Sequence, residues 1–300
     1  MTSKNLIKLD KAEKSLFTPL FHTEEEPEEK VVTEEGNYHP RNTMNHLTGK
    51  QWIHFTRSWF NLKPKPRSKE TGEYLHPAKY PEELMERFIK FFTKRGMWVL
   101  DPFCGTASTL VAAEDCKRNA VGFEVSQKWA KIAADRTKNY VVIGDARKIP
   151  NADLPPIDFC ISSPPYWDML HHSRGGSEST HKERIAAGFD ATFSELDSDL
   201  GNIEEYEKFL SALLDVYEGI SKVMTPEGYC VVILQNIQKP KRQFYPLAWE
   251  FALEMRNRGW DLCQEMLWCQ SDKKLGIWGY PNTYISNVHH HYCLVFQSSR

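Results

Sequence analysis

Two short stretches of this sequence combine residue types that could do chemistry. In residues 97–109, an apolar run suited to a buried strand ends in Asp101 and breaks at Gly105, where a ligand can approach the backbone closely. In residues 157–167, a second apolar run stops at Ser-Pro-Pro-Tyr, residues 163–166, called here the tetrad. Two consecutive prolines continue neither a strand nor a helix, so they stiffen the chain where the sheet ends. Rigid hydrogen-bond acceptors beside an aromatic ring suit a flat nitrogen heterocycle.

Together the two stretches resemble the amino-methyltransferases that use S-adenosylmethionine to methylate exocyclic nitrogens of nucleic-acid bases. Residues 101–105 (Asp-Pro-Phe-Cys-Gly) match the cofactor loop of that family, and the tetrad is similar to the variant typical of N4-cytosine DNA methyltransferases. Residues 76–81 (His-Pro-Ala-Lys-Tyr-Pro), the lid segment, resemble a family segment that precedes the cofactor strand and closes over the amino-acid end of S-adenosylmethionine. The resemblance extends over about residues 75–297.

The tetrad predicts how a base amine is activated. Such an amine is a poor nucleophile because its lone pair is delocalised into the ring, and acceptors that hold both N–H bonds favour a localised lone pair. We expect the Ser163 hydroxyl and a carbonyl of Ser163 or Pro164 to be these acceptors, held stiff by Pro164 and Pro165. Tyr166 is expected to stack on a base flipped out of the double helix. Methyl transfer is then a direct displacement at the sulfonium, which needs positioning and no covalent intermediate.

The rival chemistry, methylation at C5 of cytosine, needs a thiolate that adds to the ring. Cys104 lies in the matched cofactor loop and Cys160 within a strand, and neither follows a proline at the base site. The sequence therefore disfavours the cysteine mechanism.

Cofactor contacts follow from the ends of successive strands. Glu124 ends a strand about 20 residues beyond the glycine turn, where a carboxylate accepts hydrogen bonds from ribose hydroxyls. The resemblance places Asp145, at the end of the next strand, against the adenine amine. Ala107 stands where the family usually has a second glycine, and its Cβ is expected to crowd the methionine moiety. The predicted cofactor-binding residues are His76, Pro77, Ala78, Tyr80, Pro81, Asp101, Phe103, Cys104, Gly105, Thr106, Ser108, Thr109, Glu124, Val125, Asp145 and Ala146.

The pattern of elements predicts an α/β fold. The resemblance implies a Rossmann-like methyltransferase sheet of seven strands, one of them antiparallel, with helices on both faces. Residues 1–47 are charge-rich and predict a polar arm, and residues 48–75 predict an aromatic helix followed by a basic linker. The helix is expected over residues 48–60 because its aromatic residues recur at helical spacing. Residues 76–300 form the predicted catalytic domain.

The expected partner is double-stranded DNA with a flipped cytosine, and the enzyme is expected either to stand alone or to pair with a cognate restriction endonuclease. A net charge of −2 argues mildly against nonspecific nucleic-acid binding, but one basic face suffices for an enzyme. Residues 167–202 and 270–288 are candidate recognition loops. The predicted nucleic-acid contacts are Trp167, Arg174, Lys182, Arg184, Lys239, Lys241 and Arg242.

Composition indicates a cytoplasmic protein without a membrane segment. No apolar run approaches the roughly 18 residues of a membrane span, and the N-terminus lacks a secretory signal. The 7 cysteines show no paired spacing and suit a reducing compartment. His289 and His291 share one strand face, but nothing completes a metal set, so we predict packed or surface histidines and no metal.

The leading hypothesis is a site-specific, S-adenosylmethionine-dependent N4-cytosine DNA methyltransferase. Ser163 stands where adenine enzymes commonly have Asp, which favours cytosine without deciding the matter. An N6-adenine DNA methyltransferase or an RNA amino-methyltransferase keeps the same chemistry. A catalytically silent nucleic-acid-binding protein of the same fold is the non-enzymatic alternative.

Overall fold

The computed structural model describes residues 6–8, 38–62, 80–167, 196, 198–239, 243–271, 273, 275–277 and 279–299. Its strands are β1 (Leu6–Lys8), β2 (Trp59–Asn61), β3 (Trp98–Asp101), β4 (Asn119–Glu124), β5 (Tyr140–Ile143), β6 (Ile157–Ser162), β7 (Met224–Leu234), β8 (Ile237–Gln238), β9 (Phe244–Tyr245), β10 (Trp260–Cys269) and β11 (His290–Ser298). Its helices are α1 (Gly49–Phe55), α2 (Glu82–Phe92), α3 (Ser108–Asp115), α4 (Gln127–Arg136), α6 (Tyr206–Ile220) and α7 (Leu247–Asn257), with the 3₁₀ helices η3 (Ala146–Asn151) and η5 (Leu200–Asn202).

The predicted fold class is confirmed. One nine-stranded sheet runs in the order β1-β5-β4-β3-β6-β7-β11-β10-β2, and β11 is antiparallel to both of its neighbours. The sequence predicts seven of these strands, namely β5, β4, β3, β6, β7, β11 and β10. The predicted antiparallel strand is β11. β8 and β9 form a separate two-stranded sheet.

Two edge strands were missed by the sequence prediction. β1, in the predicted polar arm, pairs in parallel with β5. The predicted helix over residues 48–60 ends at Phe55, and Trp59–Asn61 pairs with β10 as β2. Thr48 and Gln51 form a capping box that starts α1. In β2 the residues alternate between exposed and buried, the period of a strand, so the recurring aromatics belong to two elements.

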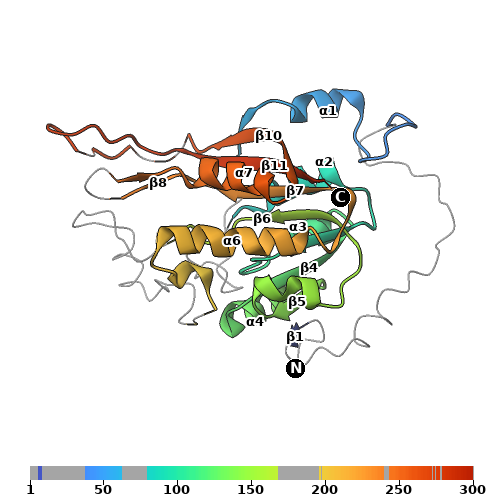
Figure 1. Ribbon diagram of the computed structural model, residues 1–300. Helices are drawn as coiled ribbons and strands as arrows, with labels where there is room; N and C mark the ends of the chain where they lie inside the picture. The colour runs from blue at the N-terminus through green and yellow to red at the C-terminus, as the bar shows by residue number, and fades with distance from the viewer. Residues whose placement is uncertain are drawn as a thin grey trace.

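The sheet is covered on both faces (Figure 1). α6 and α7 lie in front of it in that view and α2 and α3 behind it. Successive residues of β6 serve the two layers, because Phe159 packs in the cluster that contains α2 and α3, whereas Cys160 packs in the cluster that contains α6 and α7. This arrangement explains why the strand sequences are nearly continuous apolar runs.

The sheet topology places the two chemical motifs next to each other. β3 pairs in parallel with β6, with Leu100 opposite Cys160, and in parallel with β4, with Asp101 opposite Gly122. Parallel neighbours end at one edge, so the turn after β3, the acid that ends β4 and the tetrad after β6 share that edge. The switch in strand order between β4-β3 and β6 is where α/β sheets bind ligands.

The described helices are all too short or too polar to cross a membrane.

Gly122 is expected to be necessary for packing the turn after β3 on β4. A Cβ at this position would lie 2.6 Å from Cys104 Cβ and 2.8 Å from Leu110 Cδ1. We therefore expect Gly122→Ala to lower the free energy of unfolding by about 1–3 kcal/mol in urea denaturation. Gly49→Ala is the control, because no atom lies within 4 Å of its built Cβ and alanine favours a helix. Equal stability of both variants would contradict this account of the turn.

Candidate active site at the carboxyl edge of the sheet

Asp101 is a buried acid at the floor of the site. Its carboxylate accepts hydrogen bonds from the Phe103 amide at 3.0 Å and from the Thr109 hydroxyl. The residue is 4% exposed, and burial raises its pKa to about 6 despite these hydrogen bonds. A nearby cation would stabilise the ionised form of Asp101, because its positive charge compensates for the hydration that burial removes.

Glu124, the predicted ribose ligand, lies beside the same turn. One carboxylate oxygen accepts from the Gly105 amide at 3.0 Å and the other from the Ser126 amide at 2.8 Å. Burial raises its pKa to about 7. A carboxylate offers about four lone-pair positions, so both oxygens keep capacity for hydroxyl donors. A buried acid that ends β3 and a half-buried acid that ends β4, both bonded to amides of the same turn, favour a cationic ligand that carries hydroxyl groups.

The turn itself depends on two residues with left-handed backbone. Gly105 has φ 51° and Ala107 has φ 69°. Glycine adopts this region without strain, whereas an L-residue with a Cβ does so at a cost. Ala107 is fully buried and precedes α3. A second glycine in the resembled loop is thus explained by backbone conformation, in addition to the crowding that the sequence suggests.

Tyr80 joins the lid segment to both motifs. The Ser108 hydroxyl donates to the Tyr80 carbonyl at 2.8 Å, and the Tyr80 hydroxyl is hydrogen-bonded to the Tyr166 hydroxyl. The Ser163 hydroxyl donates to Tyr166 Oη at 3.3 Å, and Tyr166 in turn donates to the Ile233 carbonyl at 3.1 Å. The structure therefore brings together residues of the lid, the turn and the tetrad that the sequence assigned to one site.

The tyrosines of this network act as hydrogen-bonding groups and not as bases. Burial raises the pKa of Tyr80 to about 12 and that of Tyr166 well above its ordinary value. Tyr166 is only 6% exposed, so in this conformation its ring faces are covered and stacking on a base requires it to move.

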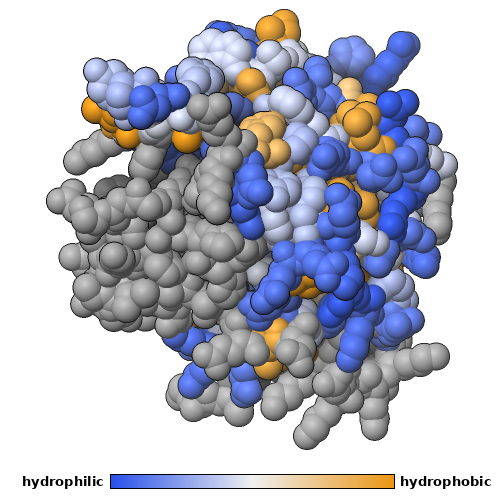
Figure 2. Space-filling model, turned by 60° about the vertical axis from the view of Figure 1, so that its left-hand side comes forward, coloured by the Kyte–Doolittle hydropathy of each residue, from blue (hydrophilic) through white to orange (hydrophobic). Residues whose placement is uncertain are grey.

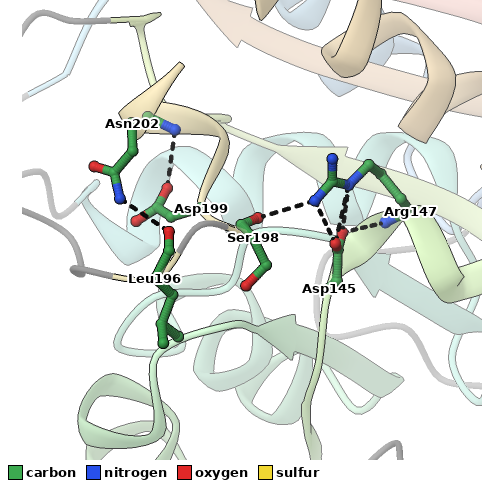
Figure 3. Close-up of polar contacts among 7 residues, drawn as sticks. Asp145, Arg147, Leu196, Ser198, Asp199 and Asn202 are labelled. Atoms are coloured by element: carbon green, nitrogen blue, oxygen red, sulfur yellow. Dashed lines mark hydrogen bonds and ion pairs between the residues drawn. The ribbon is translucent and has the colours of Figure 1, made fainter. Parts of the chain in front are cut away.

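Asp145, the predicted adenine contact, is already paired (Figure 3). Its two oxygens accept from the Arg147 backbone amide at 2.9 Å and from the guanidinium at 2.6–3.0 Å. Arg147 also donates to the Ser198 carbonyl at 3.4 Å, on the chain that returns to the sheet before α6. An amine that reaches Asp145 must share it with this arginine.

The other predicted cofactor residues surround the turn. Thr106 and Ala146 are buried, Pro81 immediately precedes α2, and Val125 follows β4. Burial and the nearby acids raise the pKa of the Cys104 thiol well above its ordinary value, so it remains a thiol. His76, Pro77 and Ala78 lie outside the described residues.

The predicted nucleic-acid contacts are only partly described. Trp167 is 5% exposed, its indole N–H donates to the Glu204 carbonyl at 3.1 Å, and Lys239 Nζ lies 3.4 Å from its ring centroid. The Trp167 ring is therefore covered in this conformation, and Lys239 is placed against it. The predicted contacts outside the described residues are Arg174, Lys182, Arg184, Lys241 and Arg242.

The β10–β11 connection projects beyond the sheet (Figure 1) and contains the candidate recognition loop 270–288. Leu275, Ile277, Tyr280 and Tyr284 on it are 77–90% exposed. On the face shown in Figure 2, apolar residues of the described part lie scattered among hydrophilic ones. Exposure of four large apolar side chains on a single connection thus distinguishes it from that background.

Sequence reasoning missed one group beside the tetrad. His291 is 7% exposed, as its predicted packing implies, but it packs on Tyr166 and Tyr80 of the site, with ring centroids 6.1 and 5.7 Å away. Trp268 stacks on it at 4.9 Å. No local signal marks this group, because it depends on the register between β10 and β11.

The comparisons with known proteins agree with the motifs. Residues 8–135 match the N6_N4_Mtase family model, described as DNA methylase. The orphan methyltransferase M.BamHII of Bacillus amyloliquefaciens is 37% identical over 70 residues, 23% of this chain and 26% of the relative. Type II methyltransferase M2.DpnII of Streptococcus pneumoniae is 37% identical over 78 residues, 26% and 28% of the two chains. Type II methyltransferase M.MthZI of Methanothermobacter thermautotrophicus is 41% identical over 59 residues, 20% and 17%.

These matched segments span less than a third of each relative's length. Among solved structures, a TehB-like SAM-dependent methyltransferase from Corynebacterium glutamicum is 13% identical, with a TM-score of 0.42, over 71% of this chain and 86% of the other. A methyltransferase from Pyrococcus furiosus is 16% identical, with a TM-score of 0.41, over 74% and 86%.

Thr109→Val is expected to destabilise the protein in a pH-dependent way. Valine keeps the shape but removes the hydroxyl that bonds the Asp101 carboxylate, so the free energy of unfolding should fall by about 1–3 kcal/mol at pH 8. Because the pKa of Asp101 is about 6, the carboxyl is largely protonated at pH 5 and needs this donor less, so the loss should be smaller there.

Urea denaturation at the two pH values measures both effects. Thr56→Val is the matched control, because the Thr56 hydroxyl bonds the Ile53 carbonyl at the exposed end of α1. It should change the free energy of unfolding by less than about 0.5 kcal/mol at either pH. A loss in Thr109→Val that does not depend on pH would refute the role given to the ionised Asp101.

Proposed function

We propose that this protein moves a methyl group from S-adenosylmethionine to the exocyclic N4 amine of cytosine in DNA, because residues 8–135 match the DNA methylase model and the similar proteins are DNA methyltransferases. The observation that supports this most is the junction at the sheet edge. The tetrad after β6 stands beside the acidic turn after β3, and Tyr80 is hydrogen-bonded to both. An acceptor amine and a methyl donor bound there would be neighbours.

The residues around the turn fit S-adenosylmethionine. Asp101 is buried, Glu124 is half-buried and both have raised pKa values, and a sulfonium with an α-amino group supplies a positive charge that stabilises their ionised forms. Glu124 keeps lone pairs for the ribose hydroxyls, as its position at the end of β4 predicts. Gly105 has left-handed backbone and no Cβ, so a ligand can approach the chain closely at this position. When bound, the cofactor supplies an electrophilic methyl group.

The chain's own residues prepare the acceptor. The Ser163 hydroxyl and a carbonyl of Ser163 or Pro164 hold the two N–H bonds of the amine, so that its lone pair is directed at the methyl group. Pro164 and Pro165 keep these acceptors in place, which lowers the entropy cost of the approach. The Ser163 hydroxyl now donates to Tyr166 Oη, which leaves its lone pairs to accept an N–H bond of the entering amine. On transfer, the amine nitrogen would bond the methyl carbon as that carbon's bond to sulfur breaks, and the nitrogen would then release one proton to water.

The remaining partners follow from this assignment. The substrate is double-stranded DNA with the cytosine flipped out of the stack, and the protein pairs with a cognate restriction endonuclease. The proposed basic contacts to DNA are Arg174, Lys182, Arg184, Lys239, Lys241 and Arg242. The N6 amine of adenine is the alternative acceptor, because the family model covers both kinds of base amine.

Ser163→Ala is the direct test of the tetrad. We expect methylation of plasmid DNA to fall by about a hundredfold or more, because one acceptor for the amine is lost, while the affinity for S-adenosylmethionine stays within about twofold. The readout is the amount of N4-methylcytosine and N6-methyladenine in digested plasmid, measured by mass spectrometry, with calorimetry for the cofactor.

Ser221→Ala is the matched control, because Ser221 is buried at the end of α6, where its hydroxyl bonds the Glu218 carbonyl. It should methylate like the wild type. Methylation of total RNA alone, or of adenine alone, by the wild type would refute the proposed substrate. Unchanged methylation by Ser163→Ala would refute the role of the tetrad.

Cofactor affinity should rise with pH. The pKa values of Asp101 and Glu124 are raised to about 6 and about 7, so both carboxyls must lose protons before they attract a cation. Calorimetry should show about tenfold tighter binding of S-adenosylmethionine at pH 8 than at pH 6.

Glu124→Gln should remove most of this pH dependence and weaken binding at pH 8 by about tenfold or more. The control is Glu254→Gln on α7, whose carboxylate bonds the nearby Asn257 amide on the surface. It should retain wild-type affinity at both pH values. Wild-type binding that is equally tight at pH 6 and pH 8 would contradict the electrostatic account.

A further inference from the structure

Four rings meet beside the tetrad, Tyr80, Tyr166, Trp268 and His291, called here the ring cluster. Trp268 on β10 is directly opposite His291 on β11, and the two rings stack with 26° between their planes. The His291 ring also contacts Tyr166 and Tyr80, whose hydroxyls lead to Ser163. The cluster thus connects the strand pair to the proposed amine-binding hydroxyl.

Two nitrogens of this cluster have no hydrogen-bond partner among the described residues. They are Nδ1 of His291 and Nε1 of Trp268, and the two side chains are 7% and 4% exposed. Buried polar groups are nearly always paired, and an unpaired one costs stability. A phenylalanine at either position would fill similar space without this cost. The two nitrogens are therefore explained better by a ligand than by packing.

The chemistry of the pair defines what that ligand presents. An indole N–H only donates, so Trp268 needs a hydrogen-bond acceptor. Burial, Lys273 and His290 lower the pKa of His291 to about 3, so its imidazole is neutral at pH 7 and carries one N–H. With that proton on Nδ1, each of the two stacked rings carries one unpaired hydrogen-bond donor.

We propose that Trp268 and His291 form a wall of the acceptor-base pocket and that their two unpaired nitrogens donate hydrogen bonds to the flipped base. This inference rests on the proposed function and names residues that choose the base. The base enters the space that opens when Tyr166 releases the Ile233 carbonyl.

This pair of donors favours cytosine over adenine. Beyond the amine held by Ser163, the pairing edge of cytosine presents N3 and then O2, which are both acceptors. Beyond its amine, adenine presents N1 and then a C–H group, so that one of the two buried donors stays unpaired. Sites that hydrogen-bond a substrate group reject analogues that lack it.

Trp268→Phe and His291→Phe keep an aromatic ring and remove the unpaired nitrogen. We expect each to reduce N4-methylcytosine formation in plasmid DNA by about tenfold or more and to lower the ratio of N4-methylcytosine to N6-methyladenine. Affinity for S-adenosylmethionine should stay within about twofold of the wild type. The melting temperature of the free protein should be unchanged or higher, because an unpaired buried group has been removed.

The control is His290→Phe, the adjacent residue on β11, whose ring contacts Tyr292 and not the ring cluster. It should retain the wild-type rate and base ratio. Wild-type rates and ratios in Trp268→Phe and His291→Phe, with an active wild type, would overturn the inference alone. A melting temperature well below that of the wild type in both variants would also overturn it, because the nitrogens would then be structural. A wild type that methylates no base would overturn the proposed function together with this inference.

Discussion

Two carboxylates at one edge of the sheet, Asp101 buried and Glu124 half-buried, are the constraint from which the site's geometry follows. Asp101 and Glu124 give up hydration, and backbone amides of the turn after β3 and of the residue before α4 replace part of it. Those amides point at the acids only because the chain turns sharply, with left-handed backbone at Gly105 and Ala107. The shape of the turn and the positions of the two carboxylates therefore depend on each other. The amides replace only part of the hydration that the carboxylates lose, and a bound cation would replace the rest.

Tyr80 transmits this arrangement to the acceptor side. Its carbonyl is held by Ser108 at the start of α3 and its hydroxyl by Tyr166 of the tetrad. A second tie lies nearby, because Arg136 of α4 donates both to the Thr106 carbonyl and to Glu82 at the start of α2. The lid segment thus enters the fold at a point anchored to the turn, so that occupation of the turn and the position of the tetrad are mechanically linked.

The sequence predicted the parts of the site that have a local cause. The sequence reveals the apolar runs of β3, β4 and β6, because buried parallel strands leave a continuous apolar pattern. It therefore also locates Asp101, Glu124 and the tetrad, which lie at the ends of these strands. β1 and β2 were missed because a strand of three residues is too short for its period to be recognised in the sequence. The covered ring of Trp167 and the pairing of Trp268 with His291 depend on long-range register, which no local window contains.

Arg147, which lies outside the predicted site, limits what the predicted site residue Asp145 can bind. The resemblance gives Asp145 a free carboxylate, but four hydrogen bonds from Arg147 fill about all of its lone-pair positions. The Arg147 side chain is 38% exposed, so solvent screens the ion pair and it adds little stability. Its effect is one of position: by holding Asp145 and the Ser198 carbonyl at once, Arg147 joins the end of β5 to the chain that returns after the tetrad. The proposed adenine contact is consequently built by two segments, and a ligand at Asp145 must compete with the contact that joins them.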